Sequence, residues 1–505
     1  MRYGDANYQE AGMTVASSLT VRQLGILRPA HRETVFCQTL VVGNSVAAYT
    51  ATLAILQAGG QVCWAQAGKS NGGATWPEQL RLQPATSYFS WRLGRRISPW
   101  EEGTVMSQSQ QTFWTQGRSR PALRATPPEV ASDNFEATSA PSPPHTRDSQ
   151  FRQAIAPYLQ NQQLMLIPQG RPIRVLYSQQ RQQRRVHQVV FYDVTTQQQF
   201  QVHARLILDA TAGARLQQDL AVASAATLIP EHEITVDEAI APQRHEARGV
   251  FFTDSVALVM ATGTSSGAKP HPVSVPLRSL ILQNTEGFLN VSMPGCEPQL
   301  RPLFAHPRAQ WALGEAAGQI AARAAQLGSL QALRQSPHWA WRLQQTLVRQ
   351  GIPIFAFDDV ALDDPDFEAI QMVAIADVVR TMRRRDLSFR PTTPITKAVL
   401  ASALARLPQS PMPSPDAKAP LADVSANHWA KSAIQTAIAN HTLTPEADTT
   451  FAPSKVLTKR QLWQVIQPLL PPSITVPLFS LDDTPARRRH LSRSLYPILQ
   501  AQLSD

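Results

Sequence analysis

The residues with the clearest chemical pattern form a turn between an apolar run and a helical pattern. The turn and the first helical residues that matter are Gly43, Asn44, Ser45, Val46 and Ala48. A glycine that leads from a strand into a helix lets backbone N–H groups and the positive end of the helix dipole face a phosphate. The pattern is compatible with a phosphate site of the kind that holds a dinucleotide, although the turn by itself favours an ordinary structural βαβ unit.

Three positions depart from the full dinucleotide pattern. Ser45 stands where a second glycine lets the backbone approach the pyrophosphate, and Ala48 replaces the third glycine. The Ser45 side chain either clashes with a phosphate or donates a hydrogen bond to it. Gln66 ends the next apolar run, where an acidic residue usually holds the ribose hydroxyls. A neutral acceptor contributes about 1 kcal/mol where a charged one contributes about 1.5–3 kcal/mol, so the affinity falls about tenfold.

The elements that position this turn can be read from the apolar pattern. Residues 40–66 predict a strand, a helix and a second strand. Later β-rich runs predict antiparallel strands that lead into a final buried strand at Leu206–Ala210. Residues 311–328 predict a helix rich in small residues. Between these elements, residues 97–150 are polar and rich in Pro and Ser, which predicts a mobile insertion.

Across residues 37–350 the chain resembles the FAD-dependent oxidoreductases. Five blocks occur in the order that this family shows, namely "AGGQV" (58–62), "NGGATW" (71–76), "ARLILDATAGARL" (204–216), "VSVPLRSLILQNTEGFLNVS" (273–292) and "WALGEAAGQIAARA" (311–324). The resemblance implies an α/β fold with an FAD/NAD(P)-binding Rossmann-like domain and an inserted β-rich section.

The resemblance also implies FAD as the cofactor. Beyond the turn residues and Gln66, it places near the cofactor Gly72, Gly73, Thr75, Thr211, Arg278, Gly314 and Gly318. One departure is Ala214-Arg215, which stands where the family has Gly-Asp.

No acid or base can be assigned with the same support. His271 and His306 lie near the matched blocks and are the candidates for proton transfer. A single histidine is more often a hydrogen-bonded structural residue, and the flavin itself would supply most of the chemistry.

The second half of the chain contains a repeat. Residues 357–407 and 421–470 each open with Asp-Val and later carry a Phe-x-Pro turn followed by Thr-Lys, which predicts helices with threonine N-caps. These units resemble S-layer homology modules, with His428-Trp-Ala430 matching well. The resemblance implies all-α helical repeat modules with contacts to a protein or to a wall polysaccharide. Residues 1–36 are predicted as an N-terminal arm and 471–505 as a C-terminal tail.

Composition narrows the remaining classes of function. The net charge is +10, but no aromatic residues interleave with the scattered Arg residues, so nucleic-acid binding is not expected. Cys37, Cys63 and Cys296 indicate no disulfide framework, and Cys63 is predicted to be a buried thiol. The His and Cys spacings indicate no metal site. No signal peptide or membrane span is apparent, so a cytoplasmic protein is expected.

Three functions remain open from the sequence. The first is an FAD-dependent oxidoreductase that acts on a small-molecule substrate. The second is a scaffold or binding protein that keeps the flavoprotein fold without its cofactor. The third is a protein that contacts cell-wall polysaccharide through its C-terminal modules.

Overall fold

The structure is a computed structural model of the 505-residue chain. The residues that it describes are 34–66, 91–92, 95–96, 153–168, 170–236, 238, 254–261, 271–355, 357, 359–379, 388–408, 421–447, 449–474 and 476–504. Residues 1–33 of the predicted N-terminal arm (1–36) and the predicted insertion at 97–150 lie outside these ranges, as do Gly72, Gly73 and Thr75. Residues 34–36 of that arm instead begin the first strand of the sheet.

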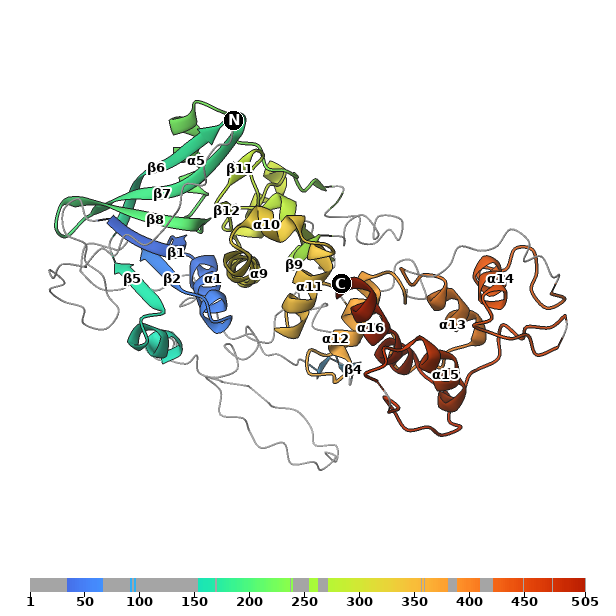
Figure 1. The fold of residues 1–505 in the computed structure, drawn as a ribbon. Helices are drawn as coiled ribbons and strands as arrows, with labels where there is room; N and C mark the ends of the chain where they lie inside the picture. The colour runs from blue at the N-terminus through green and yellow to red at the C-terminus, as the bar shows by residue number, and fades with distance from the viewer. Residues whose placement is uncertain are drawn as a thin grey trace, which may run out of the picture.

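An eight-stranded sheet organises the first half of the chain (Figure 1). Its strands are β1 (Thr34–Val42), β2 (Val62–Gln66), β5 (Leu164–Pro168), β6 (Gly170–Gln180), β7 (Gln183–Asp193), β8 (Gln198–Asp209), β11 (Thr285–Glu286) and β12 (Phe288–Asn290). The main order is β11-β7-β8-β1-β2-β5, with β12 beside β8 and β6 beside β7. The strands β1, β2, β5, β8 and β12 are mutually parallel. The predicted mixed α/β class is confirmed.

Two helices cover one face of the parallel strands. They are α1 (Val46–Gln57), which follows β1 directly, and α9 (Pro307–Leu327), which packs against α1, β1 and β8 (Figure 1). The opposite face belongs to a second core cluster, which includes Leu40 of β1 and Phe191 and Phe200 of the β7–β8 hairpin. Because both faces of β1 are covered, its last four residues are all buried.

Smaller elements complete this half of the chain. The helices are α5 (Arg215–Ser224), α8 (Arg301–Ala305), α10 (Leu330–Gln335) and α11 (Trp339–Arg349). A two-stranded sheet joins β9 (Ser255–Ala261) and β10 (His271–Pro276), and a second one joins β3 (Trp91–Arg92) and β4 (Arg95–Arg96).

A disulfide joins the first two strands, which corrects the expectation drawn from the cysteines. Cys37 of β1 and Cys63 of β2 are bonded, with their Cα atoms 5.9 Å apart, while Cys296 is free and buried. Cys63 is therefore not a free thiol. The spacing of the cysteines along the chain could not indicate this bond, because it depends on β1 and β2 lying side by side in the sheet.

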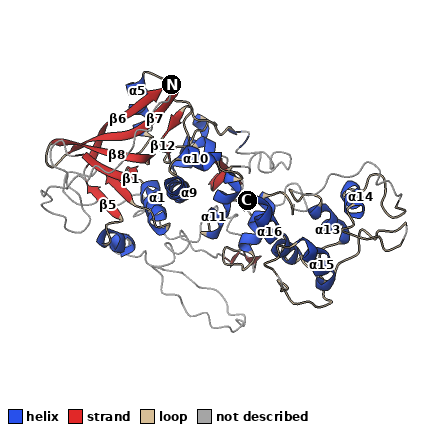
Figure 2. Cartoon of the chain, viewed as in Figure 1, coloured by secondary structure: helices blue, strands red, loops and turns tan. Residues whose placement is uncertain are grey.

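The second half of the chain is helical (Figure 2). Its helices are α12 (Phe367–Ile375), α13 (Lys397–Leu404), α14 (Lys431–Ala439), α15 (Lys459–Ile466) and α16 (Arg488–Ser504). The side chains of Thr396 and Thr458 accept from backbone N–H groups at the starts of α13 and α15, so both predicted N-caps are confirmed. Helix α16 falls within residues 471–505, the predicted tail.

Equivalent contacts recur in the two repeated units. The carboxylate of Asp359 accepts from the amides of Phe389 and Arg390. The carboxylate of Asp423 accepts from the amides of Phe451 and Ala452 in the same way. The segments before α13, α15 and α16 also meet, through the bridges Pro394–Arg487, Thr396–Val456 and Thr458–Pro485. The relation of these units to S-layer homology modules stays a prediction.

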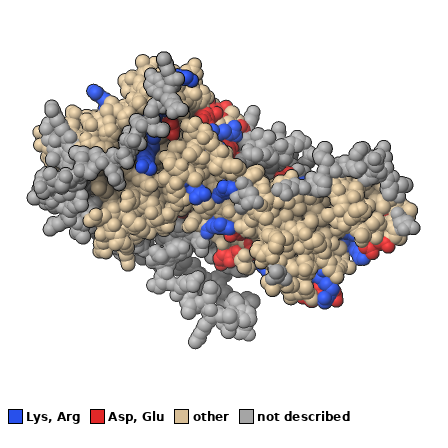
Figure 3. Space-filling model, in the orientation of Figure 1, with Lys and Arg blue, Asp and Glu red and all other residues tan. Residues whose placement is uncertain are grey.

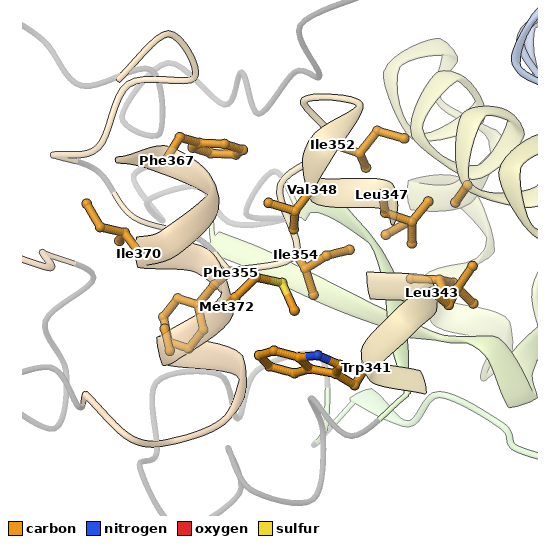
Figure 4. Packing of buried hydrophobic residues seen from close by; sticks show 14 of the residues in the cluster. Trp341, Leu343, Leu347, Val348, Ile352, Ile354, Phe355, Phe367, Ile370 and Met372 are labelled. Atoms are coloured by element: carbon orange, nitrogen blue, oxygen red, sulfur yellow. The ribbon is translucent and has the colours of Figure 1, made fainter. Parts of the chain in front are cut away.

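One hydrophobic core runs from the sheet into the helical half. Figure 4 shows Trp341 and Leu347 of α11 and Phe367 and Met372 of α12 in one cluster, with Ile354 between the two helices. Polar bonds reinforce this junction, because Glu368 of α12 accepts from Arg349 of α11 and from the Tyr496 hydroxyl of α16.

The surface carries charges of both signs. In the view of Figure 3, Lys and Arg side chains occur in small groups, several of them beside Asp or Glu. Among the described residues, no helix combines the length and the apolar character needed to cross a membrane.

Candidate functional site

The turn between β1 and α1 is fixed at both of its ends. Gly43 has φ +135°, a conformation that favours glycine, and a Cβ there would lie 2.2 Å from the carbonyl oxygen of Ala210. The Gly43 amide donates to the carbonyl of Ala65 at 3.0 Å, and its carbonyl accepts from Trp64 Nε1 at 2.9 Å. The turn is thus held between β2 and the segment that follows β8.

Ser45 is the N-cap of α1, and its hydroxyl has two partners. Oγ accepts from the amide of Ala48 at 3.1 Å and donates to the carbonyl oxygen of Ala210 at 2.7 Å. A hydroxyl has one proton, so in this conformation Ser45 has none left to donate to a phosphate. The first helical residues, Val46 and Ala47, have buried side chains, and a helix leaves their amides without intrahelical partners.

Gln66 lies at the same edge of the sheet. It is the last residue of β2, it is fully buried, and it is paired in register with Pro168 of β5. Because the carboxyl ends of β1 and β2 point the same way, Gln66 and the Gly43 turn lie at one edge, as predicted for a βαβ unit. Asn44 lies within the turn, between Gly43 and the N-cap.

A second turn, which follows β8, contacts the Gly43 turn. The carboxylate of Asp209 accepts from the amide and hydroxyl of Thr211 and from the amide of Gln217, and the Thr211 hydroxyl accepts from the amide of Arg215. Complete burial raises the pKa of Asp209 to about 6, and hydrogen bonds from Thr211, Gln217 and Leu216 oppose this rise. Thr211, predicted near the cofactor, thus holds the shape of this turn.

Gly314 and Gly318 serve the packing of two helices. A Cβ at Gly314 would lie 1.9 Å from Thr50 Oγ1, and one at Gly318 would lie 2.5 Å from the carbonyl oxygen of Ala51. Thr50 and Ala51 belong to α1, so both glycines allow α9 to approach α1 closely. This contact fixes the start of α1 relative to the sheet, which is an indirect role in any site at that helix terminus.

Arg278 forms an ion pair with Asp254. Its Nε lies 2.7 Å from Asp254 Oδ2, and the side chain of Asp254 is 7% exposed while that of Arg278 is 41% exposed. The hydrogen bond with Asp254 raises the pKa of Arg278. The sequence predicted Arg278 but gave no sign of Asp254 as its partner.

The two candidate histidines occupy different elements. His306 is the N-cap of α9, and its Nδ1 accepts from the amide of Arg308 at 3.3 Å. Burial, together with the nearby Arg308, lowers the pKa of His306. His271 is the first residue of β10, where its backbone pairs with Ala261. His306 therefore acts as a helix cap.

Sequence reasoning missed two residues that shape this edge, Asp209 and Ala210. Asp209 anchors four donors of the turn after β8, and Ala210 supplies the carbonyl that meets Gly43 and Ser45. The signal was present, since Asp-Ala-Thr directly follows the apolar run that ends β8. An aspartate followed two residues later by threonine commonly forms a side-chain-bonded turn.

No family model matches the chain, and no curated protein matches it. Among solved structures, THI4 of Thermovibrio ammonificans is 12% identical, covers 57% of this chain and 89% of its own, and gives a TM-score of 0.29. A geranylgeranyl bacteriochlorophyll reductase-like protein from Thermoplasma acidophilum is 10% identical. The match covers 74% of this chain and 96% of that protein, with a TM-score of 0.27.

A third similar structure is the glycerol-3-phosphate dehydrogenase from Bacillus halodurans complexed with FAD. It is 11% identical, covers 35% of this chain and 34% of its own, and gives a TM-score of 0.18. Similarity of this size carries no argument about activity, so the function must be inferred from the residues of the site.

Proposed function

We propose that this protein binds FAD at the carboxyl edge of β1, β2 and β8 and acts as an oxidoreductase on a small-molecule substrate. The observation that carries the proposal is the Gly43 turn, which starts α1 between the ends of two parallel strands. This is the position at which open parallel sheets bind nucleotides, because the turn and the helix terminus both face the end of the sheet.

The residues present fit a dinucleotide with reduced affinity. The amides of Val46 and Ala47 and the dipole of α1 suit a pyrophosphate. Gln66 offers a neutral carboxamide for the ribose hydroxyls, in place of a carboxylate. The Ser45 hydroxyl donates its proton to the carbonyl oxygen of Ala210, so it donates no hydrogen bond to the phosphate in this conformation. Together these residues form a helix terminus that can bind an anion, with fewer polar contacts to the dinucleotide than the complete dinucleotide-binding pattern provides.

When bound, FAD would supply hydride or electron transfer, the chemistry that the chain's own side chains lack. The protein would then bind and orient the dinucleotide. Asp209 and Thr211 would hold the adjoining turn in place, and the contact between α1 and α9 would keep the phosphate-binding terminus rigid.

The test is the visible absorption spectrum of the protein purified without added cofactor, followed by a titration with FAD. Flavin bands that co-purify, or FAD fluorescence that is quenched with a defined stoichiometry, would support the proposal. A colourless protein that also leaves FAD fluorescence unchanged would refute it and favour a scaffold without cofactor. A titration with FMN is the control, because FMN lacks the pyrophosphate and adenosine that the α1 terminus and Gln66 would hold.

A further inference from the structure

A cleft of about 650 Å³ lies beside the tip of the β6–β7 hairpin. Four parts of the chain line it: the hairpin tip, residues 281–286 with β11, helix α10, and Glu231. A cavity of about 150 Å³ already admits a six-membered ring, so this cleft has room for more than one such ring. None of the residues assigned above to FAD is among the described residues that line the cleft.

Hydrogen bonds within the protein fix the walls of this cleft. Two guanidinium nitrogens of Arg334 lie 2.9 and 2.8 Å from the two carboxylate oxygens of Glu231, which is a bidentate ion pair. The Glu231 amide donates to the carbonyl of Ile281 at 2.9 Å, and the Arg184 amide donates to the carbonyl of Asn284 at 2.8 Å. Helix α10, the Glu231 segment, residues 281–286 and the hairpin are therefore held together without a ligand.

The charges along the cleft cancel. Arg181 and Arg334 are the cations among the described lining residues, and Glu231 and Glu286 are the anions. Arg334 and Glu231 neutralise each other, whereas Arg181 and Glu286 have no ion-pair partner in the described part of the chain. The cleft therefore favours a ligand without net charge.

Side-chain amides supply the other hydrogen-bonding groups. Each amide carries two donors and one acceptor oxygen. The apolar residues add little surface, because Ile281 and Leu330 are only 2% and 5% exposed, and the described lining includes no aromatic ring. An apolar compound or a stacked nucleobase would thus find few contacts. Five exposed residues line the cleft with side-chain amides that bond to no other described residue, namely Gln180, Gln182, Gln183, Asn284 and Gln331.

A neutral compound with several hydroxyl groups matches this surface. A hydroxyl both donates and accepts, as a side-chain amide does, so the two can exchange hydrogen bonds in either direction. Two adjacent hydroxyls can also donate to the carboxylate of Glu286, and hydroxyl oxygens can accept from Arg181. Hydrogen bonds to charged groups are the stronger ones, so these two residues would anchor the ligand.

We propose that this cleft is a binding site for a saccharide of one or two rings. The Glu286 carboxylate and the Arg181 guanidinium anchor its hydroxyl groups, and the amides of the hairpin tip, Asn284 and Gln331 bind the others. This inference does not depend on FAD binding.

The experiment measures binding to the full chain by ligand-observed NMR. The probes are the methyl glycosides of glucose, galactose and mannose, together with maltose. Tetrahydropyran is the matched probe, because it has the same six-membered ring without hydroxyl groups. We expect at least one of the saccharides to bind with a Kd of about 1 mM, which a few net hydrogen bonds supply. Tetrahydropyran should not bind at the same concentration.

Three variants test the location of the site. Gln331→Ala removes one lining amide and should weaken saccharide binding about fivefold, and Glu286→Gln removes a charged acceptor at constant shape and should weaken it about tenfold. Gln335→Ala is the matched control, because Gln335 is exposed on the same helix α10 and does not line the cleft. The circular dichroism spectrum checks that each variant is folded.

Three results would overturn the proposal. The first is a wild-type protein that binds none of the saccharides, and the second is binding that stays unchanged in both folded variants, Gln331→Ala and Glu286→Gln. The third is binding of the zwitterion glycine betaine in preference to the saccharides, which would instead make Arg181 and Glu286 a site for a compound with two opposite charges.

Discussion

The Ser45 hydroxyl donates to the carbonyl oxygen of Ala210 at 2.7 Å and joins two turns that are far apart in the sequence. One turn starts α1, and the other follows β8. The same carbonyl lies against Gly43, where any Cβ would overlap it. The hydrogen bond from Ser45 to Ala210 therefore joins the two turns at this edge of the sheet. It uses the hydroxyl proton that Ser45 could otherwise donate to a phosphate.

Replacing Ser45 tests whether this contact limits cofactor affinity. Ser45→Gly removes both the Cβ and the hydroxyl, so we expect FAD affinity to rise about tenfold, with a loss of stability of about 1 kcal/mol from the missing bonds. Ser45→Ala keeps the Cβ and removes only the hydroxyl, which separates the two effects. The measurement is a fluorescence titration with FAD. A Ser45→Gly protein that binds FAD no more tightly than wild type would contradict this role.

Gln66 is predicted to hold the ribose of the bound dinucleotide. Gln66→Leu removes both polar atoms at nearly constant size, so FAD affinity should fall about fivefold, as expected for one neutral hydrogen bond. Gln57→Leu is the matched control, because Gln57 is an exposed residue at the end of α1 and should leave the affinity unchanged. An unchanged affinity in Gln66→Leu would place the ribose elsewhere.

Gly314 is predicted to be a packing residue. In Gly314→Ala the added methyl group would overlap Thr50 Oγ1 and the carbonyl of Ala47, so we expect a loss of about 1–3 kcal/mol in the free energy of unfolding. Urea denaturation measures this loss, and Gln326→Ala on the exposed side of α9 should change the stability by less than about 0.5 kcal/mol. If Gly314→Ala instead keeps its stability and loses FAD binding, the glycine contacts the cofactor.

The disulfide between Cys37 and Cys63 should stabilise the sheet. The bond closes a loop with a sequence separation of 26, for which loop-closure entropy gives about 3–4 kcal/mol. Urea denaturation with and without a dithiol reductant measures the difference. The double variant Cys37→Ala with Cys63→Ala should be less stable and insensitive to the reductant. A thiol titration of the denatured, unreduced protein should find only Cys296; finding all three cysteines free would show that the bond does not form.

Asp209 should make stability depend on pH in the acid range. Its folded-state pKa of about 6 lies above its ordinary value of 3.8, so the folded state binds the proton more tightly than the unfolded state does. This contribution is complete below about pH 4 and is lost as the pH rises to about 6, with an amplitude of up to about 3 kcal/mol.

The measurement is the free energy of unfolding at several pH values for wild type and Asp209→Asn. The variant should lack this part of the pH dependence, although it also loses an acceptor for the amides of the turn. Parallel curves for wild type and Asp209→Asn would show that Asp209 has the same pKa in the folded and unfolded states.

Local features of this protein were determined by the sequence itself. The apolar run before Gly43 predicted β1 and the start of α1, since the hydrophobic period and a glycine suffice to mark a strand-to-helix turn. The two Thr-Lys pairs predicted the helix caps at Thr396 and Thr458, because an N-cap bond spans only three residues.

Contacts between distant segments were decided only by the tertiary structure. The Cys37–Cys63 bond, the bond from Ser45 to Ala210 and the role of Gly314 against Thr50 each require two segments to be placed side by side by the sheet or by helix packing. A sequence pattern records which residues can make such contacts, and the packing of the whole chain determines which of them do.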